Sequence, residues 1–161
     1  MKRNSSYRYP KTVREMVEGQ RHYILNEEKL PSVTTILSAT QSAEKRESLA
    51  KWRERVGEET ATRIVDSAGA RGTAMHKILE KYVLGEGYLD ETSVGKQAHN
   101  MAIQVIQSGL SNVTEFYGTE CTLYYPGLYA GQTDLVGIHK GEDAIIDFKP
   151  VSYTHLRAHE T

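Results

Sequence analysis

The sequence predicts an α+β fold, and three patterns in it support this class. Residues 42–110 repeat apolar side chains every three to four positions, which is the period of helices with one buried face. From residue 113 onwards the period changes towards two, the alternation typical of strands. A short strand is also predicted at residues 22–25, ahead of the helices. Strands and helices therefore occupy separate parts of the chain, as in α+β proteins.

The composition is that of a soluble globular domain. The chain has 161 residues, enough for one domain with a real core, and is 39% hydrophobic and 25% charged with a mean hydropathy of -0.54. A net charge of -1 gives no general basic surface for nucleic acid, although a local basic patch is sufficient for binding. No apolar run approaches a membrane span, and the N-terminus lacks the apolar segment of a signal peptide. We therefore expect a cytoplasmic protein with no membrane partner.

The chain has a single cysteine, Cys121. One thiol excludes an internal disulfide framework, and it excludes zinc or iron–sulfur sites built from several thiolates of this chain. A lone cysteine also fits a reducing compartment.

The sequence does not decide the structure of two N-terminal segments. Residues 1–21 are polar and locally basic, with Tyr7 and Tyr9 among the charges. They are either a partly disordered arm or an arm that contacts phosphates and stacks its tyrosines on bases. Residues 31–37, PSVTTIL, suit either a short helix capped by Ser32 or a strand.

A basic helix is predicted at residues 44–56, and Gly57 ends it before a second helix at 58–67. The basic helix has two interpretations. It is an amphipathic helix with a solvated charged face, or it lies along a phosphate backbone. In the second case Trp52 and Arg53 are its candidate nucleic-acid contacts.

The next helix, at residues 70–84, carries a histidine beside its core stripe. The stripe consists of Met75, Ile78, Leu79, Tyr82 and Val83. Gly69 and Gly72 remove side chains before His76, which would let the helix start approach another backbone closely. His76 and Glu80 share one face. His76 is either a structural residue or a site residue, and Arg71 is either a phosphate clamp or a surface residue. A last helix, at 94–110, presents only a core stripe.

Residues 131–149 read as two strands joined by a tight turn, and they carry Asp134, Asp147 and Lys149. With a two-residue turn at Lys140 and Gly141, Asp134 lies opposite Asp147; with a loop two residues longer it faces Lys149. Either register places the three charged groups on one face. Directly opposed like charges are destabilising unless something neutralises them, and a divalent cation does so.

A third acid, Glu120, joins this face for one turn geometry. Residues 119–125 form a strand, and a three-residue loop after it pairs Tyr125 with Tyr129 and sets Glu120 opposite Asp134. A two-residue loop would turn Glu120 to the other face, as a surface glutamate. We prefer the site interpretation because it places three acids beside a lysine.

This constellation suits metal-assisted hydrolysis of a phosphodiester. Carboxylates hold Mg²⁺ or Mn²⁺ through oxygen, and the ion activates water and stabilises phosphoryl charge. Lys149 would orient or deprotonate the attacking water, or stabilise the transition state. His76, reaching in from its helix, would complete a mixed histidine and carboxylate site.

The motifs GQTDLV and AIIDFK together resemble the core of the PD-(D/E)XK nuclease superfamily. RGTAMHKILEKY resembles the helix that supplies a histidine in RecB-type and phage exonucleases. PSVTTIL followed by LAKWRERVGEE is similar to the N-terminal part of the mitochondrial genome maintenance exonuclease group and its phage relatives. The resemblance covers residues 22–149. It implies a restriction-endonuclease-like fold, with a mixed central sheet flanked by helices.

The resemblance also implies a function and roles for residues. Members cut DNA with Mg²⁺ or Mn²⁺, many from free ends and often as single strands, in phage or bacterial replication, recombination or repair. Asp134 and Asp147 would be metal ligands, Lys149 the catalytic lysine, His76 a further metal ligand, and Glu120 a metal ligand supplied by the preceding strand. Thr133 stands where the superfamily has proline, a departure that the family tolerates. The iron–sulfur branch is excluded by the single cysteine.

The match fails after Lys149. Residues 150–161, PVSYTHLRAHET, resemble the adaptor-like tail found at the ends of metagenomic gene predictions, so we expect a non-native tail. The nuclease core at 22–149 would then be truncated at its C-terminus and impaired, behind a polar arm at 1–21. The alternative function is a non-catalytic module of the same fold that binds single-stranded DNA.

Overall fold

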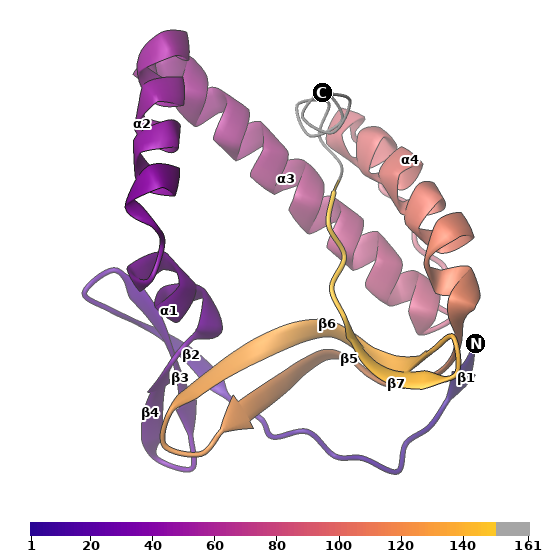
Figure 1. Ribbon diagram of the computed structural model, residues 1–161. Coiled ribbons are helices and arrows are strands. Elements are labelled where there is room, and N and C mark those ends of the chain that lie inside the picture. Colours follow the sequence, from indigo (N-terminus) through magenta and orange to yellow (C-terminus); the bar gives the residue numbers. More distant parts are fainter. Residues whose placement is uncertain (151–161) are drawn as a thin grey trace.

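The computed structural model describes residues 1–150, which form four α-helices and two sheets (Figure 1). The larger sheet has four strands in the order β1-β5-β6-β7. β1 pairs with β5 in parallel and the other pairs are antiparallel, so the sheet is mixed. These strands are β1 (Lys2–Arg3), β5 (Val113–Tyr125), β6 (Tyr129–His139) and β7 (Glu142–Ile146). The α+β class with a mixed central sheet and flanking helices is confirmed. The expected non-native tail, apart from Pro150, lies outside the described residues.

The smaller sheet is antiparallel, in the order β2-β3-β4. Its strands are β2 (Val13–Val17), β3 (Gln20–Leu25) and β4 (Glu28–Pro31). Both connecting turns have positive φ at their two central residues, Glu18 with Gly19 and Asn26 with Glu27, which is the geometry of tight hairpins. The strand expected at 22–25 is confirmed. The partly disordered arm expected at 1–21 instead contributes β1 and β2, because pairing with β5 and β3 supplies partners that local composition does not reveal.

Residues after β4 form the helix α1 (Val33–Ala39), which decides between the two structures left open for this segment. Ser32 is the cap: its Oγ accepts a hydrogen bond from the amide of Thr35 at 3.0 Å. The Thr35 hydroxyl donates to the carbonyl of Arg21 at 2.9 Å, which fixes α1 to β3.

Three longer helices follow: α2 (Ala43–Val56), α3 (Glu58–Val83) and α4 (Ser93–Ser108). Gly57 separates α2 from α3, as expected. The break expected between residues 67 and 70 is wrong, since Ala68 and Gly69 continue one helix of 26 residues. An interior glycine costs only about 1 kcal/mol relative to alanine, which the rest of a long helix outweighs. Among the described helices, none combines the length and apolarity that crossing a bilayer requires.

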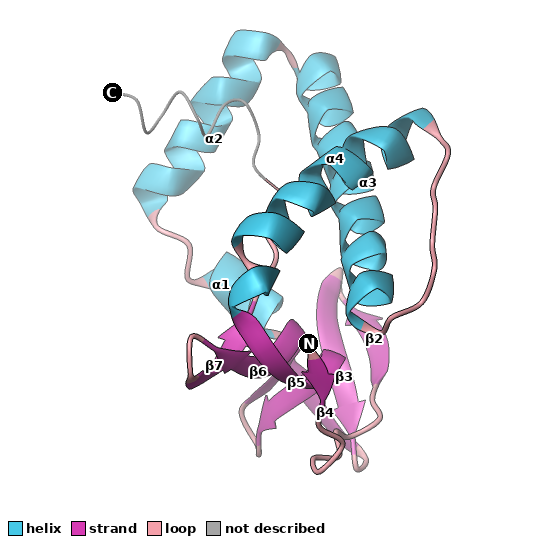
Figure 2. Cartoon of the chain, turned by 90° about the vertical axis from the view of Figure 1, so that its right-hand side faces the viewer, coloured by secondary structure: helices cyan, strands magenta, loops and turns pink. Residues whose placement is uncertain are grey.

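The main core lies between the helix pair α3–α4 and the larger sheet, and Figure 2 shows the helices gathered on one side of the strands. Met75, Ile78, Leu79 and Val83 of α3 are buried there, as the apolar stripe predicts. Tyr82 is the exception, because half of it is exposed, at 50%. α2 buries none of its side chains.

The two hairpins of the larger sheet have the registers that place acids together. The β5–β6 loop has three residues, Gly127 has a φ of 76°, and Tyr125 pairs with Tyr129. The β6–β7 turn has two residues, Lys140 and Gly141, with φ of 49° and 84°. These registers are the ones that set both Glu120 and Asp147 opposite Asp134.

Candidate metal centre

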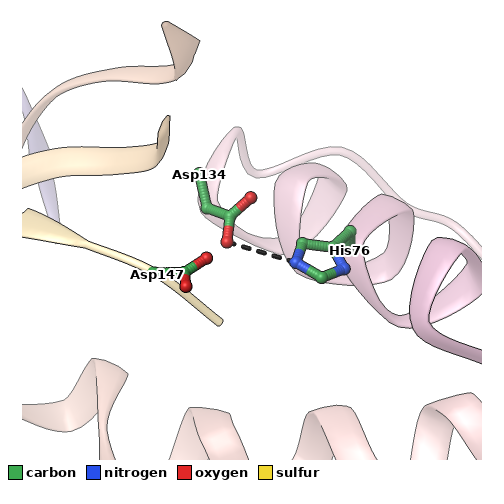
Figure 3. Close-up of side chains that lie close together, drawn as sticks. All are labelled: His76, Asp134 and Asp147. Carbon is green, nitrogen blue, oxygen red and sulfur yellow. Dashed lines mark hydrogen bonds and ion pairs between the residues drawn. The ribbon is translucent and has the colours of Figure 1, made fainter. Parts of the chain in front are cut away.

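Three side chains from separate elements converge at the edge of the main core. One ligand atom from each of His76, Asp134 and Asp147 lies within 4.8 Å of the others. His76 belongs to α3, Asp134 to β6, and Asp147 follows the last residue of β7 (Figure 3). The structure therefore brings together three of the residues that the sequence singles out.

The chain beyond β7 is held in place by Asp134 itself. The amide of Phe148 donates a hydrogen bond to Oδ2 of Asp134 at 2.7 Å. The Phe148 side chain is 5% exposed and packs in the main core, so it anchors this segment. Alternation then places Asp147 and Lys149 away from the core, on either side of Phe148 in sequence.

The imidazole of His76 is oriented from within its own helix. Its Nδ1 lies 2.7 Å from the carbonyl oxygen of Gly72, which only accepts, so Nδ1 carries the hydrogen. Nε2 is left facing Oδ2 of Asp134 at 3.1 Å. This arrangement, in which a backbone carbonyl fixes the tautomer, is usual for metal-binding histidines.

The two glycines before His76 do not have the expected role. They lie inside α3 and not at its start. A Cβ placed at Gly69 would meet nothing within 4 Å, and one at Gly72 would meet only Pro150, at 3.9 Å. No backbone therefore makes a close approach that requires glycine at either position.

Hydrogen bonding controls the ionisation of this centre. Hydrogen bonding to Asp134 raises the pKa of His76 to about 9, against the opposing effect of burial. Burial raises the pKa of Asp134, but hydrogen bonds with His76, Asp147 and the Phe148 amide outweigh it and hold the pKa below its ordinary value. Without a cation, His76 and Asp134 therefore form an ion pair at neutral pH, with 31% and 12% of their side chains exposed.

The donor atoms fit a hard divalent cation. Neighbouring ligands of an octahedral ion, each about 2.1 Å from it, lie about 3.0 Å apart. Nε2 of His76 and Oδ2 of Asp134 are 3.1 Å apart. The two carboxylates are donors that suit Mg²⁺ and Mn²⁺, and the imidazole is a donor that also suits transition metals such as zinc and iron, so the donor set indicates a divalent metal without identifying it. A cation bound to Nε2 would take the place of its proton.

Glu120 lies beside this group without joining it. Burial, and then the charge of Asp134, raise the pKa of Glu120. Its carboxylate accepts a hydrogen bond from Nε2 of Gln132 at 2.9 Å. Its backbone φ is 50°, an uncommon value for a residue other than glycine. Among the described residues, the three-ligand group contains His76, Asp134 and Asp147 but not Glu120.

Lys149 reaches the centre through one of its acids. Its Nζ lies 2.8 Å from Oδ2 of Asp147, and this hydrogen bond raises the pKa of the lysine. The lysine side chain is 81% exposed, so its ammonium group is accessible from solvent.

The three predicted nucleic-acid contacts are not brought to the centre. Trp52 and Arg53 lie on α2, where Arg53 forms an ion pair with Glu58 at 3.1 Å. Arg71 lies half-buried on α3, and none of these three side chains lines the cavities that border the centre.

Two arginines of the basic segment at residues 1–21, for which contact with phosphates is one of the two interpretations, lie beside the centre. Arg14 of β2 and Arg21 of β3 line a cavity of about 640 Å³ that also contains Asp134 and Asp147. Both arginines also line a cavity of about 890 Å³ that contains His76. Strand alternation in residues 13–25 predicts that Arg14 and Arg21 share one face of a hairpin. It does not predict which part of the protein that face packs against.

Comparison with known proteins points to nucleases. The chain is similar to mitochondrial genome maintenance exonuclease 1 of Mus musculus, with 28% identity over 132 residues. The match covers 78% of this chain and 38% of that protein, so this chain spans well under half of the relative's length. No family model matches the chain. The similarity supports a nuclease-like family and a nuclease function in general.

Proposed function

We propose that this protein is a metal-dependent nuclease of the PD-(D/E)XK type that hydrolyses phosphodiester bonds in DNA. The observation that carries the proposal is the group formed by His76, Asp134 and Asp147, with Lys149 ion-paired to the same Asp147. The similarity to an exonuclease supports the reaction class independently of this geometry.

In this proposal the three residues of the group hold the ion. Mg²⁺ or Mn²⁺, when bound, supplies an activated water and stabilises negative charge on a phosphoryl oxygen. Asp134 and Asp147 offer carboxylate oxygens, and neutral His76 offers Nε2 while Nδ1 stays bonded to the Gly72 carbonyl. Glu120, adjacent to Asp134, is proposed as a further acid that accepts hydrogen bonds from water around the ion.

We assign Lys149 as the catalytic lysine of this proposal. Its ammonium group is exposed and lies next to Asp147. From there it donates a hydrogen bond to the attacking water or to a phosphoryl oxygen, which orients the first and stabilises charge on the second. If Asp147 held a cation, its carboxylate would be less available to Lys149, and the ammonium group would then be free to contact the substrate.

The finer parts of the proposal concern the substrate and its setting. We propose action on DNA ends or single strands in phage or bacterial replication, recombination or repair. Trp52, Arg53 and Arg71 stay predicted contacts for DNA beyond the centre. The basic residues of α2 are exposed apart from Arg53, which is half-buried and ion-paired with Glu58, so most of this basic face is accessible to such a substrate.

A cleavage assay tests the proposal. Labelled single- and double-stranded DNA, linear and circular, would be incubated with Mg²⁺, Mn²⁺ or EDTA. We expect cleavage only with a divalent ion, and its loss in Lys149→Ala, which keeps all three proposed ligands. Wild-type cleavage by Lys149→Ala would contradict the assignment of that lysine. Salt-sensitive DNA binding with no cleavage under any condition would favour the non-catalytic module instead.

A further inference from the structure

Two of the cavities that border the candidate centre have lining residues in common. One cavity contains Asp134, Asp147 and Lys149, and the other contains His76. Arg14, Arg21 and Glu120 line both. A flexible polymer lying across the centre would therefore occupy one cavity on each side and pass the two arginines between them.

The arginines are fixed at this junction by the smaller sheet. Register pairs Arg14 with Tyr23 and Met16 with Arg21, so both arginines lie on one face of the β2–β3 hairpin. The Arg14 guanidinium donates to the side chain of Gln132 on β6 and lies 5.8 Å from the ring centre of Tyr23. Neither arginine has an acidic ion-pair partner among the described residues.

The cavity on the Asp134 side ends at a group of tyrosines. Tyr124, Tyr125 and Tyr129, on either side of the β5–β6 loop, all line it. The rings of Tyr125 and Tyr129 are stacked, with centres 6.0 Å apart and planes at 29°. These two residues are 56% and 40% exposed, so ring surface remains open to a ligand.

We propose that this cavity binds an unpaired nucleic-acid strand, with phosphates on Arg14 and Arg21 and bases against Tyr125 and Tyr129. Guanidinium groups that track a backbone beside exposed aromatic rings are the combination that binds single strands without sequence preference. Within a duplex, neighbouring base pairs cover both faces of a base and leave only its edges accessible. Stacking on the tyrosines therefore requires an unpaired strand. The proposal deepens the proposed function, on which its relation to cleavage rests, but the binding itself needs no metal.

The distance between the tyrosines and the centre gives the proposal a length requirement. Tyr129 and Asp134 are five residues apart on β6, which at about 3.4 Å per residue is on the order of 17 Å. A stacked strand advances about 3.4 Å per nucleotide, so roughly five nucleotides span this distance. Shorter oligonucleotides cannot reach the tyrosines and the centre together.

Fluorescence anisotropy in EDTA tests the stacking part. Labelled oligothymidylates of increasing length would be titrated with wild-type protein, Tyr125→Ala, and the Tyr125→Ala/Tyr129→Ala double variant. We expect the double variant to bind long oligonucleotides roughly 5- to 100-fold more weakly, with Tyr125→Ala in between. The double Tyr→Phe variant keeps the rings and should bind normally. Tyr82→Ala removes an equally exposed tyrosine from α3 and should change nothing.

Salt dependence tests the arginines. Arg14→Gln and Arg21→Gln should each weaken binding for all sequences and lower the slope of log affinity against log salt by roughly 0.7 to 1. Arg63 is an exposed arginine of α3 that lies outside both cavities, so Arg63→Gln is the charge-matched control. It should lower neither the affinity nor the salt slope.

The outcomes separate this inference from the proposed nuclease function. Equal affinity of the double tyrosine variant and the wild type for long oligonucleotides would overturn the stacking proposal, even if metal-dependent cleavage is observed. Tighter binding of duplex than of single strands would also overturn it. Tyrosine-dependent binding to strands longer than about five nucleotides would support it, even if the protein cleaves no DNA.

Discussion

Substitution of Asp134 tests the structural role and the metal-binding role of one carboxylate separately. Asp134→Ala removes the acceptor of both the Phe148 amide, at 2.7 Å, and His76 Nε2, at 3.1 Å. Asp134→Asn removes the charge but keeps a carbonyl oxygen that can accept from the Phe148 amide. The pair of variants therefore distinguishes loss of an anchor from loss of a ligand.

The structure gives a magnitude for each variant. A half-buried amide that loses its acceptor costs about 1 to 3 kcal/mol, and the Phe148 ring that it positions is 5% exposed in the main core. We discount the lost ion pair with His76 to less than about 1 kcal/mol, because 31% of the histidine side chain is exposed. Asp134→Ala should therefore lower the free energy of unfolding by about 2 to 3 kcal/mol, and Asp134→Asn by about 1 kcal/mol.

Urea unfolding without divalent ions measures the first effect, and calorimetric titration with Mn²⁺ measures the second. Both variants should lose more affinity for Mn²⁺ than the roughly 10- to 100-fold loss caused by changing an outer-shell partner. An Asp134→Ala protein as stable as the wild type would refute the anchoring role of the Phe148 hydrogen bond. Wild-type Mn²⁺ affinity in Asp134→Asn would refute the metal centre.

Three further predictions concern His76, Cys121 and Leu79. His76→Gln should weaken the binding of Mn²⁺, as measured by calorimetry. The free energy of unfolding in urea without the ion should change by less than about 1 kcal/mol, because the histidine side chain is partly exposed. Unchanged Mn²⁺ affinity would show that His76 is not a ligand of the centre. Burial raises the pKa of Cys121 to about 11, so alkylation of its thiol at pH 8 should be roughly 10²-fold slower in the native protein than in urea. The rate in the native protein should increase as the pH rises towards that pKa. Equal rates in the native and unfolded protein would contradict the burial of Cys121. Leu79→Ala, at a fully buried position, should cost about 2 to 5 kcal/mol of stability in urea unfolding, and Leu37→Ala, at a position 65% exposed, is its control.

The parts of the structure that could be predicted from sequence are those set by short-range geometry. A two-residue turn at Lys140 and Gly141 is sufficient to fix the β6–β7 register, and the register is sufficient to oppose Asp134 and Asp147. For residues 31–37 the sequence predicts either a helix capped by Ser32 or a strand. The hydrogen bond that the Thr35 amide donates to the Ser32 hydroxyl oxygen is the helix cap. The sequence leaves His76 open between a structural role and a site role, because a histidine beside a buried stripe such as Met75 and Leu79 fits either. The contact of its Nε2 with Asp134, at 3.1 Å, depends on packing between α3 and β6 that periodicity does not show.

The parts that could not be predicted depend on contacts between distant segments. β2 forms because β3 pairs with it and Gln132 of β6 accepts a hydrogen bond from Arg14, whereas the composition of residues 1–21 indicates an arm. The continuity of α3 through Gly69 reflects a small propensity cost within a long helix. Tyr82 has the correct helical position for the core but lies at its edge, which periodicity does not resolve.

One strand connects the two features on which the function would depend. Ala130 of β6 is buried against the core of the smaller sheet, with Tyr23, Leu25 and Leu30, and four residues later Asp134 belongs to the candidate centre. Gln132, between them, binds both Arg14 and Glu120. The arginines of the smaller sheet therefore lie beside the centre because this sheet packs on β6, although they are far from the acids in the sequence. This explains why motifs in residues 131–149 indicate the chemistry, while the residues that would hold the substrate come from a segment whose composition resembles an arm.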